Sequence, residues 1–202
     1  GGAGGLESRE LSVSVDGETR HSAQVVLDQA RTQHEIEIEI PGAALWSPPE
    51  PNLHLLSVRL ADDDLQTRFG VRSIDLGRDA ILINGEPVLL LGVNRHQAHP
   101  DFGHAVPPMV DLCDLQLLSE LGCNFVRGAH YPQSKGFLDL CDEMGICVWN
   151  EAIGWQHTEA HLSDPHFMAA QRAHLDEMQA MSVNHPSVIM WGVLNESRGD
   201  LH

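Results

Sequence analysis

Hydrophobic and polar residues alternate along the first third of the chain, in short segments separated by turn residues. A period of two is typical of a half-buried β-strand, because successive side chains point to opposite faces. The pattern predicts strands over residues 11–15, 21–27, 34–40 and 54–60, with turns at Asp16-Gly17 and Pro41-Gly42. Residues 1–73 are therefore predicted to form a β-sandwich, which is shorter than a complete immunoglobulin-like sandwich of about 100 residues.

A different pattern begins at residue 74. Asn84-Gly85 between apolar residues predicts a hairpin. After it, near-continuous apolar strands alternate with helices predicted over residues 109–122, 134–145 and 165–183. This order is typical of a parallel sheet that is buried on both faces and wrapped by helices. Residues 74–202 are about half of the ~250 residues in a TIM (β/α)8 barrel, so they predict the first half of one.

The predicted helices have identifiable faces and ends. The first is expected to bury a stripe formed by Val110, Cys113, Leu117 and Leu121 and to stop at Gly122. Ser134 is the expected N-cap of the second helix and Gly145 its terminator. Asp164-Pro165 is expected to open the third helix.

Polar residues follow each of the four predicted parallel strands. They are Asn94, Arg95 and His96, then Arg127, His130 and Tyr131, then Asn150 and Glu151, and finally Asn195 and Glu196. The carboxyl ends of parallel strands share one rim, and barrel enzymes hold their active sites there. Structural interpretations remain open: Glu196 could be a surface carboxylate, and Arg127 could pair with a buried acid such as Glu151.

Composition excludes some classes of partner. A net charge of −17 would repel phosphate backbones, so no nucleic-acid partner is expected. The longest apolar runs, such as residues 88–91, are too short to cross a bilayer, and no signal peptide is visible. The four cysteines form no C-x-x-C pair and are expected to be buried free thiols. These features predict a cytoplasmic protein without a membrane partner.

Three histidines, His96, His99 and His104, lie close together in the sequence. Their spacing matches no established zinc pattern, and no cysteine ligand accompanies them. No metal site is therefore predicted, although a metal-dependent hydrolase that uses His96 and His99 remains an alternative.

Several segments together resemble glycoside hydrolase family 2, the family of β-galactosidases, β-glucuronidases and β-mannosidases. They are ALWSPPEPNLHLL, FGVRSI, ILINGEPVLLLGVNRHQAHP, NFVRGAHYP, LDLCDEMGICVWNEA and HPSVIMWGVLNES, in the family's order. The resemblance implies an immunoglobulin-like sandwich that leads into a TIM barrel. It also implies retaining hydrolysis of terminal β-D-glycosides, most like that of a β-galactosidase, with a carbohydrate as the substrate.

The resemblance also implies roles for individual residues. Glu196 matches the general acid/base and Asn195 the residue that binds the sugar 2-hydroxyl. Arg127 matches an arginine that supports the nucleophile, and His96 and His130 match histidines of the sugar pocket. Asn94 and Glu151 complete the predicted substrate-binding set, although Glu151 could serve chiefly to hold Arg127.

Other implications concern what the chain lacks. The family's nucleophile is a glutamate at the end of strand seven, and this chain stops soon after strand four, so it resembles an internal fragment that is inactive alone. The family's magnesium ligands follow a pattern like E-T-H-G, and the corresponding segment AIGWQHTE does not match it. His157 is the only residue that resembles one of these ligands, so no cofactor is expected. The whole enzyme could be a homo-oligomer. Glucuronidase-type specificity, or a non-catalytic carbohydrate-binding or structural module, remains an alternative.

Overall fold

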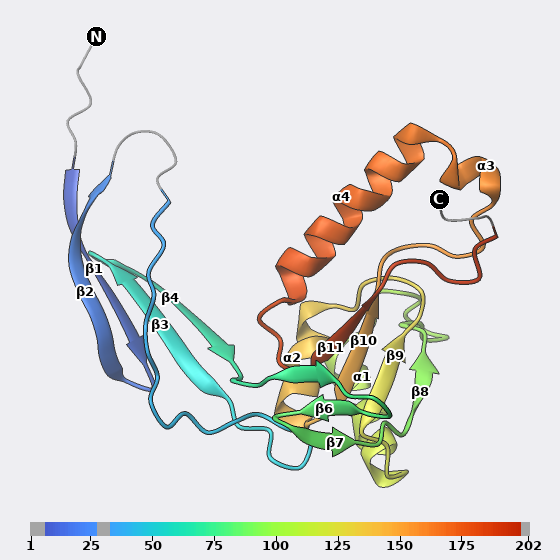
Figure 1. Cartoon of the computed structure of the whole chain (residues 1–202), viewed down its shortest axis with the longest axis horizontal. Helices are drawn as coiled ribbons and strands as arrows, with labels where there is room; N and C mark the ends of the chain where they lie inside the picture. The colour runs from blue at the N-terminus through green and yellow to red at the C-terminus, as the bar shows by residue number, and fades with distance from the viewer. Residues whose placement is uncertain (1–6, 28–32, 199–202) are drawn as a thin grey trace. The chain divides into compact units, whose positions relative to one another are not determined.

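A computed structural model describes residues 7–27 and 33–198 of the chain (Figure 1). The chain forms two compact units. The first consists of Gly1–Ala44 and Leu53–Phe69, and the second of Leu45–Asn52 and Gly70–His202. The segment Leu45–Asn52 lies between strands of the first unit in sequence but belongs to the second unit in space.

The first unit contains one antiparallel sheet with the strand order β2-β1-β3-β4. The strands are β1 (Glu7–Val15), β2 (Glu18–Leu27), β3 (His54–Leu60) and β4 (Asp63–Phe69). Asp16 and Gly17 form the predicted turn between β1 and β2, with φ of 51° and 83°. Positive φ at both central residues is the geometry that favours Asp-Gly in two-residue hairpins.

His54 ties β3 to this turn. Its Nδ1 lies 2.7 Å from Asp16 Oδ2, and its Nε2 lies 2.9 Å from the carbonyl oxygen of Ala44. Both ring nitrogens therefore face acceptors, which favours the imidazolium. The hydrogen bond to Asp16, helped by that to Ala44, raises the pKa of His54, and the same hydrogen bond lowers the pKa of Asp16.

The first unit differs from the predicted arrangement of strands. Residues 34–40 form no strand, although their isoleucines are half-buried and their glutamates mostly exposed, as the alternation requires. The alternation of apolar and polar residues determines which side chains face inward. A β-strand also needs a neighbouring strand for its backbone hydrogen bonds, and the alternation does not provide one. The strand β4 was not predicted, because it lies at the sheet edge and its polar sequence DDLQTRF has no apolar alternation. The described residues of this unit form one sheet rather than two facing sheets.

The second unit opens with a small antiparallel sheet, in the order β5-β6-β7. The strands are β5 (Ile74–Leu76), β6 (Ile81–Ile83) and β7 (Glu86–Val88). The hairpin predicted at Asn84-Gly85 is confirmed, with φ of 55° and 82° at the two turn residues.

A parallel sheet with the sequential order β8-β9-β10-β11 follows. Its strands are β8 (Gly92–Arg95), β9 (Phe125–Gly128), β10 (Cys147–Glu151) and β11 (Val188–Gly192). Between them lie α1 (Pro108–Glu120), α2 (Lys135–Met144), α3 (Glu159–Leu162) and α4 (Pro165–Ser182). The predicted alternation of parallel strands and helices is confirmed. None of the helices in the described part of the chain is both long and apolar enough to cross a membrane.

The predicted helix ends are also confirmed. The side chain of Ser134 accepts a hydrogen bond from the backbone N–H of Phe137, and Gly145 ends α2 with a left-handed φ of 69°. The side chain of Asp164 accepts a hydrogen bond from the backbone N–H of His166 at the start of α4. These ends could be predicted because each depends on residues that are adjacent in sequence.

The buried face of α1 differs from the prediction. Leu117 and Leu121 are largely exposed, whereas Leu115 and Leu118 are buried together with Asp111. Leucines occur around most of this helix, so periodicity alone did not identify a single stripe. The prediction for the cysteines was also partly wrong, because Cys141 and Cys147 are buried but Cys113 is exposed and Cys123 is half-buried.

The core of the second unit lies between its parallel sheet and α1 and α2. It comprises Leu115, Leu118, Val126, Phe137, Leu138, Cys141, Ile146, Val148 and Val188. Trp46 is fully buried nearby and donates a hydrogen bond from Nε1 to the carbonyl oxygen of Asp142, 2.9 Å away. Burial raises the pKa of the Cys147 thiol to about 12, so the thiol stays protonated near neutral pH.

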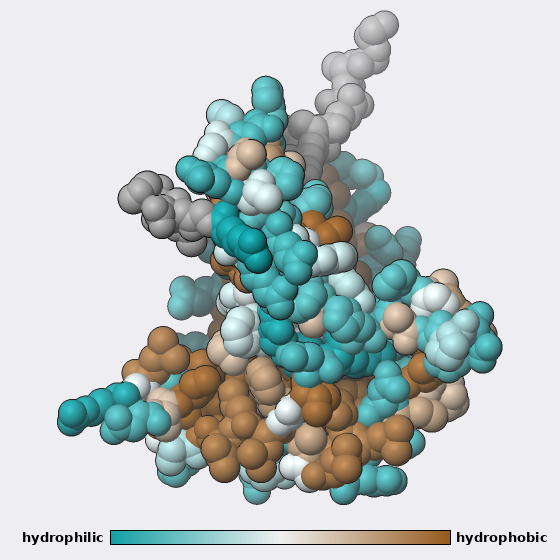
Figure 2. Space-filling model, turned by 90° about the vertical axis from the view of Figure 1, so that its right-hand side faces the viewer, coloured by the Kyte–Doolittle hydropathy of each residue, from teal (hydrophilic) through white to brown (hydrophobic). Residues whose placement is uncertain are grey.

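One edge of the parallel sheet exposes apolar residues. The edge strand β8 and the segment before it carry Leu89, Leu91 and Val93, each of which is exposed. Figure 2 shows hydrophobic side chains gathered in the lower part of the face that includes this edge. Exposed apolar edge strands are uncommon in folded proteins. Their unpaired backbone groups and apolar side chains promote association with other chains.

The corrected face of α1 gives a direct test by substitution. We predict that Leu115→Ala destabilises the 202-residue chain by about 2–5 kcal/mol, because it removes a fully buried side chain from a packed core. Leu117→Ala is the matched control and should change stability by less than about 0.5 kcal/mol. Urea denaturation followed by circular dichroism measures both. A larger loss for Leu117→Ala would favour the stripe predicted from sequence.

Candidate active site

The predicted polar residues meet at the carboxyl ends of the parallel strands. Asn94 pairs in register with Arg127, and Arg127 pairs with Trp149, so their side chains point to the same side of the sheet. Glu151 lies two residues beyond Trp149 on β10 and shares this face. The geometry therefore brings side chains from three neighbouring strands to one place.

Arg127 is the centre of this cluster. Its Nε donates a hydrogen bond to Glu151 Oε1 over 2.6 Å, and one of its terminal nitrogens donates to Asn195 Oδ1 over 2.7 Å. The other terminal nitrogen donates to Asn94 Oδ1 over 3.3 Å. The Glu151 side chain is only 4% exposed, so the guanidinium balances a carboxylate that is almost removed from water.

His130 joins the same cluster. Its Nδ1 lies 2.9 Å from Glu151 Oε2, so Glu151 uses one oxygen for Arg127 and the other for His130. The ring of His96 packs edge-on against the ring of His130, with the centroids 5.2 Å apart. The peptide bond that precedes His130 is cis.

A glycine on β11 makes room for the cluster. Gly192 pairs in register with Glu151, and a Cβ atom at this position would lie 2.3 Å from Trp149 Nε1 and 2.8 Å from Glu151 Cγ. Both distances are well below van der Waals contact, and the first involves a rigid indole. A side chain at position 192 would therefore displace Trp149 or the carboxylate that holds Arg127.

Arg95 does not belong to the cluster, although the sequence placed it among the polar strand ends. It follows Asn94 on β8, so its side chain points to the opposite face, towards the helices. There it donates hydrogen bonds to Asp111, Asp114 and Gln133. Burial raises the pKa of Asp111, and Arg95 opposes that shift. Arg95 therefore joins β8 to α1 and to the segment that precedes α2.

Glu196 lies in the segment after β11 and next to Asn195, which contacts Arg127. Its carboxylate is exposed, and its Oε2 accepts a hydrogen bond from Gln156 Nε2 over 3.0 Å. All seven predicted site residues thus lie at the same end of the sheet. Sequence reasoning missed Gln156, because it sits in a loop after β10 where no periodicity or spacing marks it.

Two cavities are informative about this arrangement. A cavity of about 380 Å³ is lined by Gln97, His104, Tyr131, Ile153 and Trp155, which all come from segments that follow β8, β9 or β10. Trp155 is 53% exposed, and its ring centroid lies 6.1 Å from that of His130. This cavity therefore adjoins the cluster and has aromatic walls, which suit the apolar face of a sugar ring.

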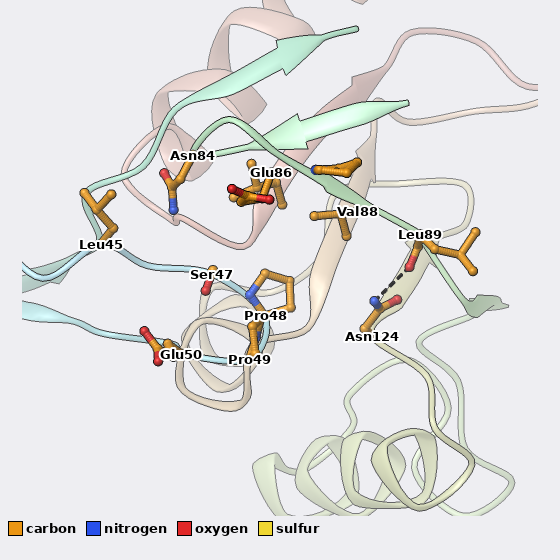
Figure 3. A pocket seen from close by; sticks show the side chains of 12 residues that line it. Leu45, Ser47, Pro48, Pro49, Glu50, Asn84, Glu86, Val88, Leu89 and Asn124 are labelled. Atoms are coloured by element: carbon orange, nitrogen blue, oxygen red, sulfur yellow. Dashed lines mark hydrogen bonds between the residues drawn. The ribbon is translucent and has the colours of Figure 1, made fainter. Parts of the chain in front are cut away.

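A larger cavity of about 610 Å³ lies at the opposite end of the sheet, among the side chains drawn in Figure 3. Its lining includes the turn residue Asn84, the prolines Pro48 and Pro49, and Asn124, which immediately precedes β9. Asn84 and Asn124 already hydrogen-bond backbone groups through their amides. The larger volume therefore does not coincide with the predicted chemistry.

Among the described residues, Asp139, Asp142 and His185 could in principle offer ligands to a metal ion. They already bind one another and their neighbours. His185 Nδ1 lies 2.6 Å from Asp142 Oδ2, and Lys135 Nζ lies 2.8 Å from Asp139. The group includes none of His96, His99 and His104.

His157, the one residue that resembles a magnesium ligand of the family, lies in the loop after β10. Its Nε2 is 3.0 Å from Gln171 Nε2, and its ring packs edge-on against Phe167. Burial lowers the pKa of His157, and the neighbouring His161 adds to that shift, so the neutral imidazole is favoured.

Two models of one protein family match nearly the whole chain. Residues 6–72 match the model described as glycosyl hydrolases family 2, and residues 74–201 match its TIM barrel domain. The chain is a member of glycosyl hydrolases family 2. Its polar strand ends therefore lie in a TIM barrel domain of a glycosidase family, as the sequence motifs implied.

Several relatives resemble the chain over most of its length. A β-galactosidase of Thermoanaerobacter pseudethanolicus is 39% identical over 88% of this chain and 25% of the relative. A putative β-glucuronidase of Formosa agariphila is 35% identical over 78% of this chain and 19% of the relative. The chain spans about a quarter or less of the length of these curated relatives.

A solved structure also resembles the chain. The crystal structure of a family 2 β-galacturonidase from Eisenbergiella tayi, bound to galacturonate, has a TM-score of 0.88 and 36% identity. The match covers 96% of this chain and 36% of that structure's chain. All three of these proteins are named as glycosidases, but the names specify different sugars: galactose, glucuronate and galacturonate.

The buried ion pair leads to a prediction about stability. We predict that Glu151→Gln destabilises the protein by about 3 kcal/mol, because a largely buried guanidinium loses its counter-charge. The exposed Glu177 of α4 provides a matched control, Glu177→Gln, which should change stability by less than about 0.5 kcal/mol. Chemical denaturation of both variants measures the difference. Equal stability of the two variants would show that Arg127 does not depend on Glu151.

Proposed function

We propose that this chain supplies part of the active site of a retaining β-glycosidase, most like a β-galactosidase, with Glu196 as the general acid/base. The observation that carries the proposal is the hydrogen-bonded cluster of Arg127, His130, Glu151 and Asn195 at the strand ends, directly beside Glu196. The family supports the glycosidase class.

The reaction explains why Glu196 stands out from the other acids of the site. A retaining glycosidase uses one carboxylic acid to protonate the leaving oxygen and a carboxylate, about 5–5.5 Å away, to attack the anomeric carbon. After the first step the same acid acts as a base towards water. A group that donates and then accepts a proton must be reachable, and the Glu196 carboxylate is exposed.

Glu151 has a supporting role in this proposal. Its two oxygens are engaged by Arg127 and His130, so it has little freedom to attack a sugar. It fixes the guanidinium, which in turn holds the side-chain oxygen of Asn195. The amide nitrogen of Asn195 is then oriented to donate a hydrogen bond to the sugar 2-hydroxyl, an interaction that strengthens as the oxocarbenium-like state develops.

A uronic acid is the second candidate substrate. The observation in its favour is the similarity to the β-galacturonidase that was solved with galacturonate. A uronate carboxylate needs a cationic or hydrogen-bonding partner, and Arg127 is already engaged by Glu151 and Asn195. A uronate carboxylate would therefore need a partner other than Arg127. Rates with aryl β-galactosides, β-glucuronides and β-galacturonides distinguish the candidates.

For the first unit we propose part of an immunoglobulin-like sandwich. Its antiparallel sheet has one buried face, which includes Leu11, Val13 and Val15, and such a face requires a second layer. The second sheet of a sandwich would meet this requirement.

The acid/base role predicts a dependence on the leaving group. In the whole protein that carries this chain, Glu196→Gln should lower kcat/KM for methyl β-glycosides by about 10²–10⁴-fold, because their leaving group must be protonated. The loss should be much smaller for 2,4-dinitrophenyl β-glycosides, which leave without a proton. Glu159→Gln, at an exposed acid of α3, is the matched control. Equal losses for both substrates would refute the assignment.

We also predict that the 202-residue chain alone shows no measurable turnover of aryl β-glycosides. The reason is that the carboxylates of the described cluster are Glu151, which is engaged by Arg127 and His130, and Glu196, which is assigned to proton transfer. Hydrolysis by the purified chain that disappears in Glu196→Gln would contradict this prediction.

A further inference from the structure

The loop after β10 is held in place on three sides. The backbone N–H of Gly154 donates to the carbonyl oxygen of His130 over 3.0 Å. On the side of β11, the backbone N–H of Gln156 donates to the carbonyl oxygen of Asn195 over 2.9 Å. Gln171 of α4 donates from Nε2 to the carbonyl oxygen of Ile153 over 3.1 Å. The loop is therefore anchored to the segments that carry the predicted site.

These hydrogen bonds fix the backbone of Gln156, whose side chain points to the carboxylate of Glu196. Gln156 has a φ of 54° and Glu196 a φ of 47°, both in the left-handed region that non-glycine residues seldom adopt. Such conformations persist where the surrounding structure determines them, and they are frequent at functional sites. Here the backbone N–H of Gln156 donates to the carbonyl oxygen of Asn195, the residue before Glu196. This hydrogen bond links the two segments at the residues with left-handed φ.

The side-chain amide of Gln156 then contacts the carboxylate of Glu196. Its Nε2 donates to Oε2 over 3.0 Å, and among the described residues no other group hydrogen-bonds this carboxylate. An exposed glutamate otherwise has several rotamers, and restricting them carries an entropic cost. With Oε2 held by the amide, Oε1 is the oxygen that is free to exchange a proton with a substrate.

We propose that Gln156 is the positioning residue of the general acid/base, holding Glu196 in the orientation that protonates the leaving group. The inference rests on the proposed function of Glu196. Gln156 itself need not touch the substrate, and its effect is transmitted through one hydrogen bond. Pre-orientation of a reacting group speeds reactions because the entropy of alignment is lost before the chemical step.

The test replaces the amide with a group of similar length that cannot donate. In the whole protein that carries this chain, Gln156→Met should lower kcat/KM for the methyl β-glycoside about tenfold, as expected for one hydrogen bond to a charged group. For the 2,4-dinitrophenyl β-glycoside of the same sugar the change should stay below about twofold, because that leaving group needs no acid. Gln179→Met, at an exposed glutamine of α4, is the matched control and should change neither value.

A double-mutant cycle separates positioning from a general structural role. On a Glu196→Ala background, Gln156→Met should have no further effect on the methyl glycoside, because the group through which it acts is gone. Gln156→Asn keeps the amide and tolerates a left-handed backbone, but its side chain is one methylene too short, so it should behave like Gln156→Met. It provides an independent variant if the methionine impairs folding.

The outcomes are distinguishable. Equal losses for both substrates, or the same loss on both backgrounds, would overturn the inference and indicate a structural role. Full activity of Gln156→Met would also overturn it, because the hydrogen bond to Glu196 would then contribute nothing to the reaction. A wild-type protein that cleaves no β-glycoside would refute the proposed function itself, and the role of Gln156 with it.

Discussion

The arrangement of the site depends on the ion pair between Arg127 and Glu151. A carboxylate that is 4% exposed is unstable unless a cation and hydrogen bonds replace its lost water, and Arg127 and His130 supply them. The guanidinium has five N–H donors in a rigid plane, so it can also reach Asn94 and Asn195. One side chain on β9 thus links residues on β8, on β10 and after β11. Glu196 is placed by this linkage, because it directly follows Asn195.

The two faces of the strands explain how the same sheet provides both a site and a core. Asn94 points to the site face, and Arg95, the next residue, points to the helices, where Asp111 and Asp114 bind it. The same alternation places Val126 in the core and Arg127 in the cluster. A shift of one residue in register would exchange these roles, so the parallel pairing of β8, β9 and β10 is as important to the site as its polar residues are.

Sequence reasoning succeeded where the determinants are local or strictly periodic. The Asn84-Gly85 turn, the Ser134 cap and the order of parallel strands each depend on neighbouring residues or on a repeated pattern. It failed where tertiary contacts decide. Asp111 is buried on α1 because Arg95 pairs with it, and the sequence of the helix does not reveal that partner. Gln156 was missed for the same reason, since its significance comes from a contact 40 residues away.

The exposed apolar edge gives this site its wider context. A TIM barrel closes eight strands on themselves and so leaves no edge, whereas the described residues form four of them in an open sheet. Leu89, Leu91 and Val93 would be exposed in such an open sheet and covered once β8 has a neighbour. Closure would also surround the cluster of Arg127 and Glu151 with further strand ends, lowering its contact with water and strengthening its hydrogen bonds. Within the proposed glycosidase function, Glu151 is unsuited to be the attacking carboxylate, because Arg127 and His130 engage both of its oxygens. The parallel sheet of this chain would then supply the proton-transfer side of the reaction, with Glu196 held by the loop that follows β10.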